Sequence, residues 1–181
     1  MVISPSKPLT LEAFLALPEG ETGYELVDGQ VIPKMAPKWL HAKSTGSLYR
    51  IFDAWSQNRG RVGIEWAITL RRRGKDWVPT PDLLYISCDR LTADWEEDAP
   101  CPVAPELAIE IISTDQTFGQ TAQKATDYLA AGVSRVWIVD PRAASITVFL
   151  PDAPPITYSG DTEISDPILP ELRLTAAQVF D

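Results

Sequence analysis

A single carboxylate interrupts an otherwise apolar segment of this chain. Glu110 lies within residues 107–112, and the remaining five residues of this segment are all apolar. A segment that is apolar on both faces is typical of a central, covered strand, and an unpaired charge in such a strand is costly to bury. Proteins meet that cost with a cation, a metal or a shifted pKa. The alternative is that Glu110 lies at the strand end and reaches solvent, or pairs with a structural arginine.

Two further residues complete a set that could do chemistry with Glu110. Asp82 follows Pro81 and opens a second apolar strand, and Lys124 lies on the helix expected after Glu110. Two carboxylates from neighbouring strands can hold Mg²⁺, which prefers hard oxygen ligands, and the metal generates a nucleophilic water. A lysine can orient that water or stabilise negative charge on the attacked phosphate. The plainer interpretation of Lys124 is a solvated side chain on the outer face of its helix.

His41 is the one histidine of the chain, so any histidine-based chemistry must use it. It lies on the inward stripe of an expected helix, seven residues before Leu48. Two interpretations stay open: a buried, hydrogen-bonded side chain, or a polar group of an active site. A serine hydrolase is disfavoured because no G-x-S-x-G turn is present, and phosphate-loop and dinucleotide fingerprints are absent as well.

The elements that must position these residues follow from hydrophobic periodicity and turn signals. Asp28-Gly29 between two apolar runs predicts an N-terminal β-hairpin. Helices are expected over 10–17, 37–58, 115–131 and 175–180, and strands over 61–71, 77–87, 107–112, 135–139, 146–150 and 156–158. The core stripe of the third helix is expected to be Phe118, Ala122, Ala125 and Leu129. One α/β domain with a mixed sheet, spanning residues 1–181, is the simplest architecture.

Charge is unevenly distributed along the chain. The net charge is −9, yet residues 34–75 hold ten basic residues and two acids, Asp53 and Glu65. Such a segment can face an anion, or it can be a solvated helix face with a polar hairpin tip. The candidates for contact with a nucleic-acid backbone are Lys43, Arg71, Arg72, Arg73 and Lys75.

Composition excludes several other classes of protein. The chain has 181 residues, 45% of them hydrophobic, which is enough for a globular core. No apolar run is long enough to cross a membrane, no signal peptide is expected over residues 1–8, and two cysteines cannot form a disulfide framework. A cytoplasmic protein without a membrane partner is expected. Of the six tryptophans, Trp55, Trp66 and Trp137 lie in core-like patterns, whereas Trp39, Trp77 and Trp95 are expected at the surface.

Taken in order, these residues resemble a known family of nucleases. Pro81-Asp82 followed by Glu110 on an apolar strand resembles the PD-(D/E)xK signature of restriction-endonuclease-like enzymes. The order of segments between Leu9 and Phe180 is similar to the Uma-type endonuclease family. The segments that carry the resemblance are 24–29, His41, 81–82, 110–113, Lys124, Tyr128, 131–133 and 136–141.

The resemblance implies a restriction-endonuclease-like α/β fold: a mixed sheet flanked by helices, with an N-terminal β-hairpin. It implies Mg²⁺ or Mn²⁺ held between Asp82 and Glu110, with Glu25 as an additional acidic residue and His41 lining the site. The chain departs from the superfamily pattern because Ile112 stands where a lysine is expected two residues after Glu110. Lys124 would then act as a migrated lysine. Ser113-Thr114 also replaces the usual Ser-Pro of the family.

Three hypotheses follow. The first is a metal-dependent endonuclease acting on nucleic acid, with DNA as the expected substrate and a homodimer as the expected assembly. The second is a catalytically degenerate, dimeric nucleic-acid-binding or interaction module of the same fold, which the net negative charge and the missing in-line lysine favour. The third is a carboxylate-pair hydrolase acting on another substrate, such as a glycoside.

Overall fold

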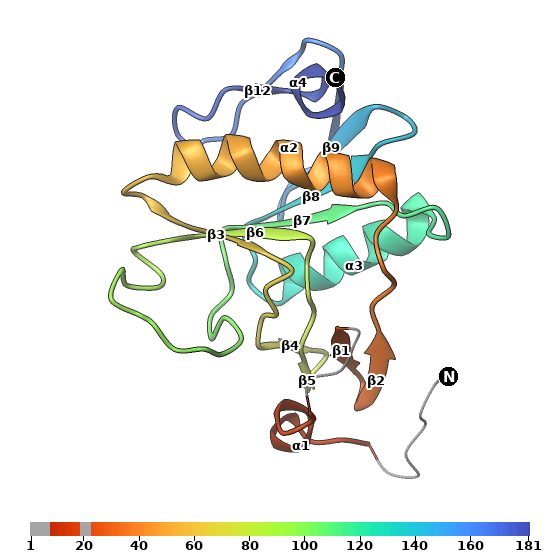
Figure 1. The fold of residues 1–181 in the computed structure, drawn as a ribbon, viewed down its shortest axis with the longest axis vertical. Coiled ribbons are helices and arrows are strands. Elements are labelled where there is room, and N and C mark those ends of the chain that lie inside the picture. The colour runs from red at the N-terminus through yellow and green to blue at the C-terminus, as the bar shows by residue number, and fades with distance from the viewer. Residues whose placement is uncertain (1–7, 19–22) are drawn as a thin grey trace.

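A six-stranded mixed sheet forms the centre of the molecule (Figure 1). The computed structural model describes residues 8–18 and 23–181. The strand order is β10 (Ile156–Ser159), β9 (Ser145–Phe149), β8 (Arg135–Asp140), β7 (Leu107–Ile111), β6 (Leu83–Ser87) and β3 (Gly60–Ile64). Strands β7 and β8 run parallel and all other neighbours in this sheet are antiparallel. The expected mixed α/β sheet is confirmed.

Helices cover both faces of this sheet. Helix α2 (Trp39–Ser56) lies across one face with α4 (Ala176–Phe180), and α3 (Phe118–Ala130) lies on the other face, where it connects β7 to β8 (Figure 1). Alternate residues of each central strand point to opposite faces of the sheet and pack into two separate hydrophobic cores. Leu107 and Ile109 pack toward α2, whereas Ala108 packs toward α3. Glu110, the next residue in that alternation, therefore faces the α3 side of the sheet.

Small hairpins surround the α3 side of the sheet. Strands β1 (Tyr24–Val27) and β2 (Gln30–Pro33) pair through a turn in which Asp28 and Gly29 both have positive φ, of 53° and 80°, as a tight two-residue hairpin requires. Strands β4 (Leu70–Arg72) and β5 (Lys75–Trp77) form a second hairpin. The two hairpins meet through a bridge between Leu26 and Val78. The predicted N-terminal hairpin is confirmed, and it lies against the segment that leads into β6.

The remaining elements lie near the two ends of the chain. Helix α1 (Leu11–Leu15) begins at Thr10, whose side chain accepts a hydrogen bond from the Ala13 amide. Strands β11 (Glu163–Ile164) and β12 (Leu174–Thr175) form a short antiparallel pair before α4. Residues 1–7, part of the segment where no signal peptide was expected, lie outside the described residues. Within the described ranges, no helix is long and apolar enough to cross a membrane.

The strand expected over residues 61–71 is broken in the structure. Strand β3 ends at Ile64, and Glu65 adopts a positive φ of 48°, which turns the backbone away from β6. Beyond it, Ile68 bonds to the carbonyl of Pro79 and bridges Cys101. The alternation of apolar residues continues through this segment, but its pairing partners change.

Two expectations about burial are wrong. The stripe of α3 that faces the core contains Ala125 and the fully buried Tyr128, whereas Phe118 is 45% exposed. Ala122 and Leu129 pack against the same core as partly buried residues, so the expected stripe is confirmed at three of its four positions and is wrong at Phe118. Trp77, expected at the surface, is buried against Tyr128 with ring centroids 4.8 Å apart.

Candidate active site

Asp82 and Glu110 meet at the junction of two neighbouring strands. The antiparallel register of β6 and β7 pairs Leu83 with Ile109, so one residue further along Asp82 stands beside Glu110 on the same face. The Asp82 amide donates to the Ile109 carbonyl at 3.0 Å, and the Ile111 amide donates to Asp82 Oδ2 at 2.7 Å. Both carboxyl groups line one cavity of about 260 Å³. Two acids far apart in sequence therefore converge at one point.

Asp82 is held between two basic side chains. Lys34, which follows β2, places Nζ 2.9 Å from Asp82 Oδ1, and His41, in the first turn of α2, places Nε2 3.1 Å from Oδ2. Burial alone favours the neutral carboxyl, but the hydrogen bond from His41 and the charge of Lys34 lower the Asp82 pKa to about 2. Asp82 is therefore ionised at neutral pH.

Glu110 is held from helix α3. The Tyr128 hydroxyl donates to Glu110 Oε1 at 2.8 Å, and Lys124 Nζ lies 2.9 Å from the same oxygen. Burial dominates and raises the Glu110 pKa to about 6, although Lys124 opposes this shift. No hydrogen bond reaches Glu110 Oε2 from the described residues, so this oxygen is left for a ligand in the cavity.

Lys124 bridges Glu110 to the N-terminal hairpin. Its Nζ lies 2.8 Å from Glu25 Oε1, and that same oxygen accepts a hydrogen bond from the Thr80 amide at 2.9 Å. Burial alone would lower the Lys124 pKa, but the charges of Glu110 and Glu25 raise it above its ordinary value. Lys124 therefore remains an ammonium group and serves as a charge and a hydrogen-bond donor rather than as a base.

All five predicted catalytic residues thus lie in one connected network. Glu110 comes from β7 and Asp82 from the residue just before β6. Lys124 comes from α3, Glu25 from β1 and His41 from α2. Four of them line the cavity, whereas His41 reaches it only through Asp82.

The sequence analysis did not identify two residues of the network, Lys34 and Tyr128, as functional residues. Lys34 was counted only as one of the basic residues of its segment, and Tyr128 was noted only as part of the family pattern. The signals available in the sequence were weak. Lys34 directly follows an apolar hairpin strand, and Tyr128 lies one helical turn after Lys124.

The predicted nucleic-acid contacts lie outside this cavity. Lys43 Nζ contacts the carbonyl oxygens of Phe180 and Asp181 at the end of α4. Arg71, Arg73 and Lys75 lie at the exposed tip of the β4–β5 hairpin.

Arg72, on the same hairpin, points inward. It pairs with Asp28 and with Asp127, and its guanidinium lies 5.8 Å from the Trp77 ring centroid. Its side chain is only 17% exposed. These contacts bind the two hairpins and α3 to one another.

The chain is similar to known proteins in sequence and in fold. The sequence pattern of the Uma2 family, described as "Putative restriction endonuclease", matches residues 11–177. A crystal structure from Anabaena variabilis ATCC 29413, described as "a putative nuclease belonging to DUF820", is similar with a TM-score of 0.82 and 25% sequence identity. The similarity covers 96% of this chain and 98% of that chain. No curated protein matches the sequence. The family resemblance and the fold class drawn from the sequence are both confirmed.

Proposed function

This chain belongs to the Uma2 family, and we propose that it is a metal-dependent endonuclease that hydrolyses phosphodiester bonds in nucleic acid, with DNA as its substrate. The observation that carries the proposal is the convergence of Asp82, Glu110, Lys34 and Lys124 on one cavity. Carboxylates that can hold a divalent cation thus lie beside ammonium groups that can hold a phosphate. This is the set of groups that phosphodiester hydrolysis requires.

Asp82 and Glu110 would hold the metal, Mg²⁺ or Mn²⁺. Two carboxylates suffice for Mg²⁺, which takes its other ligands from water and substrate phosphate, and no cluster of three or more His, Cys, Asp or Glu side chains suited to a metal occurs in the described ranges. The donor set fits because Glu110 Oε2 is free, while Asp82 Oδ1 must exchange Lys34 for the ion. When bound, the metal supplies an activated water and charge neutralisation.

The two lysines act on the substrate. Once Lys34 leaves Asp82, its ammonium group is placed to pair with an oxygen of the scissile phosphate. Lys124, kept protonated by Glu110 and Glu25, orients the attacking water or stabilises the charge that develops on phosphorus oxygens. Lys124 thereby takes the role of the lysine that is expected two residues after Glu110, where this chain has Ile112.

Three side chains hold the reacting groups in place. His41 fixes Asp82 through Oδ2, Tyr128 fixes Glu110 through Oε1, and Glu25 fixes Lys124. These are positioning residues in the proposed mechanism. The exposed tip of the β4–β5 hairpin, with Arg71, Arg73 and Lys75, supplies contacts to the phosphate backbone that carry no sequence choice.

Plasmid nicking with Mn²⁺ tests this function. Wild type is compared with Asp82→Asn and Glu110→Gln, which keep side-chain shape and remove the charge. Glu106→Gln is the control, because Glu106 is a partly buried carboxylate at the other end of β7 that pairs with Ser87 and Arg90. We expect both site variants to lose activity at least 100-fold while the control retains it, and we expect EDTA to abolish nicking. Equal residual nicking in wild type and both site variants, with all chains folded, would falsify the assignment.

One observation favours the second candidate, a nucleic-acid-binding module without turnover. Both lysines already neutralise the two acids, so the network is closed without a metal. Calorimetric titration with Mn²⁺ separates the two. Salt-sensitive DNA binding with no Mn²⁺ binding would establish the module. A homodimer, which light scattering can measure, and a cytoplasmic location stay predictions from the sequence.

A further inference from the structure

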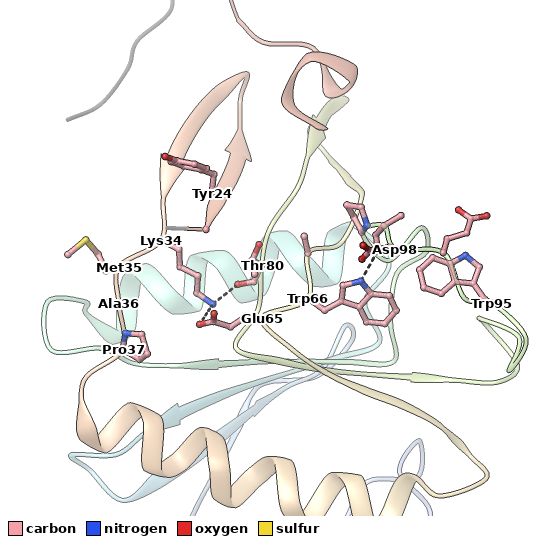
Figure 2. Close-up of a pocket in the computed structure, with 15 residues that line it drawn as sticks. Tyr24, Lys34, Met35, Ala36, Pro37, Glu65, Trp66, Thr80, Trp95 and Asp98 are labelled. Atoms are coloured by element: carbon pink, nitrogen blue, oxygen red, sulfur yellow. Dashed lines mark hydrogen bonds and ion pairs between the residues drawn. The ribbon is translucent and has the colours of Figure 1, made fainter. Parts of the chain in front are cut away.

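A larger cavity adjoins the proposed active site. It has a volume of about 760 Å³, within the range of 300–1,000 Å³ that is common for small-molecule sites. Lys34, Met35 and Ala36 line both this cavity and the smaller one that holds Asp82 and Glu110. Figure 2 shows Lys34, Glu65 and Thr80 at its centre, Tyr24 and Met35 on one side, and Trp66, Asp98 and Trp95 on the other. A ligand that reaches Lys34 from the active site can therefore extend into this cavity.

Aromatic side chains on both sides of this cavity offer surfaces for stacking. Tyr24 is 37% exposed. Trp66 and Trp95 lie with their ring centroids 5.5 Å apart. The Trp66 indole N–H donates to the Ala99 carbonyl at 2.9 Å, and Arg61 donates to the Trp95 carbonyl at 2.6 Å. The first bond orients the Trp66 ring and the second holds the backbone at Trp95. Stacking of a base on such a ring contributes about 1–3 kcal/mol.

Three of the four charged residues that line this cavity are acidic. Glu65, Glu97 and Asp98 line it, and Lys34 is the basic residue among its lining. Glu65 lies 3.4 Å from Lys34, whereas the carboxylates of Glu97 and Asp98 have no hydrogen bond or ion pair within the described part of the chain. A phosphate group would be repelled by these acids, while a neutral ring with amino groups could donate hydrogen bonds to them.

We propose that this cavity binds an unpaired nucleobase that carries an exocyclic amino group, adjacent to the phosphate held at the active site. Cytosine, adenine and guanine have such a group, and thymine and uracil do not. The base would lie against the aromatic rings and donate its amino hydrogens to Glu97 or Asp98. A base enters such a pocket only when it is flipped out or belongs to a single strand. The inference rests on the proposed nuclease function, because that function places the phosphate beside Lys34.

Nucleotide binding without metal tests the inference separately from cleavage. Tryptophan fluorescence is followed in EDTA while dCMP or dTMP is added to wild type. We expect dCMP to quench saturably and to bind about tenfold more tightly than dTMP, because one hydrogen bond to a charged group is lost with dTMP. Single strands of oligo(dC) and oligo(dT) should show the same preference, since the pocket is proposed to serve a strand.

Removal of the two acidic charges separates hydrogen bonding to the base from simple electrostatic repulsion, because the two roles predict opposite changes in nucleotide affinity. The double variant Glu97→Gln/Asp98→Asn should weaken dCMP binding about tenfold, whereas a purely electrostatic role would strengthen the binding of both nucleotides. Asp152→Asn/Asp161→Asn is the matched control, with the same charge change at exposed positions outside the cavity lining, and should change neither affinity. Tyr24→Leu should weaken dCMP and dTMP equally, since stacking does not distinguish bases.

The outcomes separate this inference from the proposed function. Equal affinities for dCMP and dTMP, no saturable binding in the millimolar range, a preference seen with free nucleotides but absent with strands, or stronger dCMP binding in Glu97→Gln/Asp98→Asn would each overturn the base pocket. Metal-dependent nicking would survive any of these results. Selective dCMP and oligo(dC) binding by a chain that nicks nothing would instead support the pocket and remove the nuclease.

Discussion

Removal of the Lys34 charge should strengthen metal binding while it slows cleavage. The Lys34 ammonium lies 2.9 Å from Asp82 Oδ1 and donates to the Thr80 carbonyl at 3.1 Å. A divalent cation that binds Asp82 must displace this ammonium group. Lys34→Met keeps much of the apolar stem and removes the competing charge, so Asp82 Oδ1 becomes free for the ion.

The expected size of the effect follows from the same contact. At an effective dielectric constant of about 20, two unit charges 2.9 Å apart attract by about 6 kcal/mol. Dehydration offsets most of this attraction because the Lys34 side chain is only 19% exposed. A hydrogen bond to a charged group has a net value of about 1.5–3 kcal/mol, so Mn²⁺ affinity should rise about 10- to 100-fold in the variant.

Calorimetric titration with Mn²⁺ at pH 7.5 measures this change. At that pH Asp82 is ionised in wild type, where its pKa is about 2, and His41 and the Ile111 amide still stabilise the carboxylate in the variant. Arg173→Met, which removes an equal charge at an exposed position outside both cavities, is the control. Nicking by Lys34→Met should fall at the same time, because the scissile phosphate loses its ammonium partner. Unchanged or weaker Mn²⁺ binding, or an equal gain in the control, would refute the reasoning.

Three further predictions concern the network and its supports. Without metal, the free energy of unfolding should fall by about 2 kcal/mol as the pH rises from 4.5 to 6. Burial raises the Glu110 pKa from 4.5 to about 6, so over this range the folded chain keeps a proton that the unfolded chain releases. Urea titrations should show no such fall in Glu110→Gln, and a fall of equal size there would contradict the assignment. Tyr128→Phe should cost about 1.5–3 kcal/mol of stability through the lost bond to Glu110, with the Trp77 contact retained; an unchanged urea midpoint would contradict the bond. Arg72→Met should destabilise the fold by about 2–4 kcal/mol with little direct effect on DNA affinity. Substitution of the exposed Arg73 in Arg73→Met should lower DNA affinity at low salt without a change in stability. The reverse pattern would contradict the roles assigned to the two arginines.

Much of the fold was readable from local patterns. The apolar run around Glu110 predicted a central strand, and Asp28-Gly29 predicted a hairpin, because burial on both faces and positive φ impose local demands on residue type. The same local pattern failed at Glu65. Apolar alternation continues there, yet the backbone turns away from β6, and which strand a segment pairs with depends on partners distant in sequence.

The sequence by itself determined which residues carry charge into the interior. A lone glutamate in an apolar strand, and an aspartate at the start of another, had to be compensated wherever the chain placed them. Only the tertiary structure decided which side chains compensate these two carboxylates. The register of β6 and β7 brought Asp82 beside Glu110, and the hairpin that precedes α2 delivered Lys34 between the two cavities. Such contacts span up to 99 residues, as between Lys124 and Glu25, so no local pattern encodes them, and the side chains meet only after the sheet has packed against its helices.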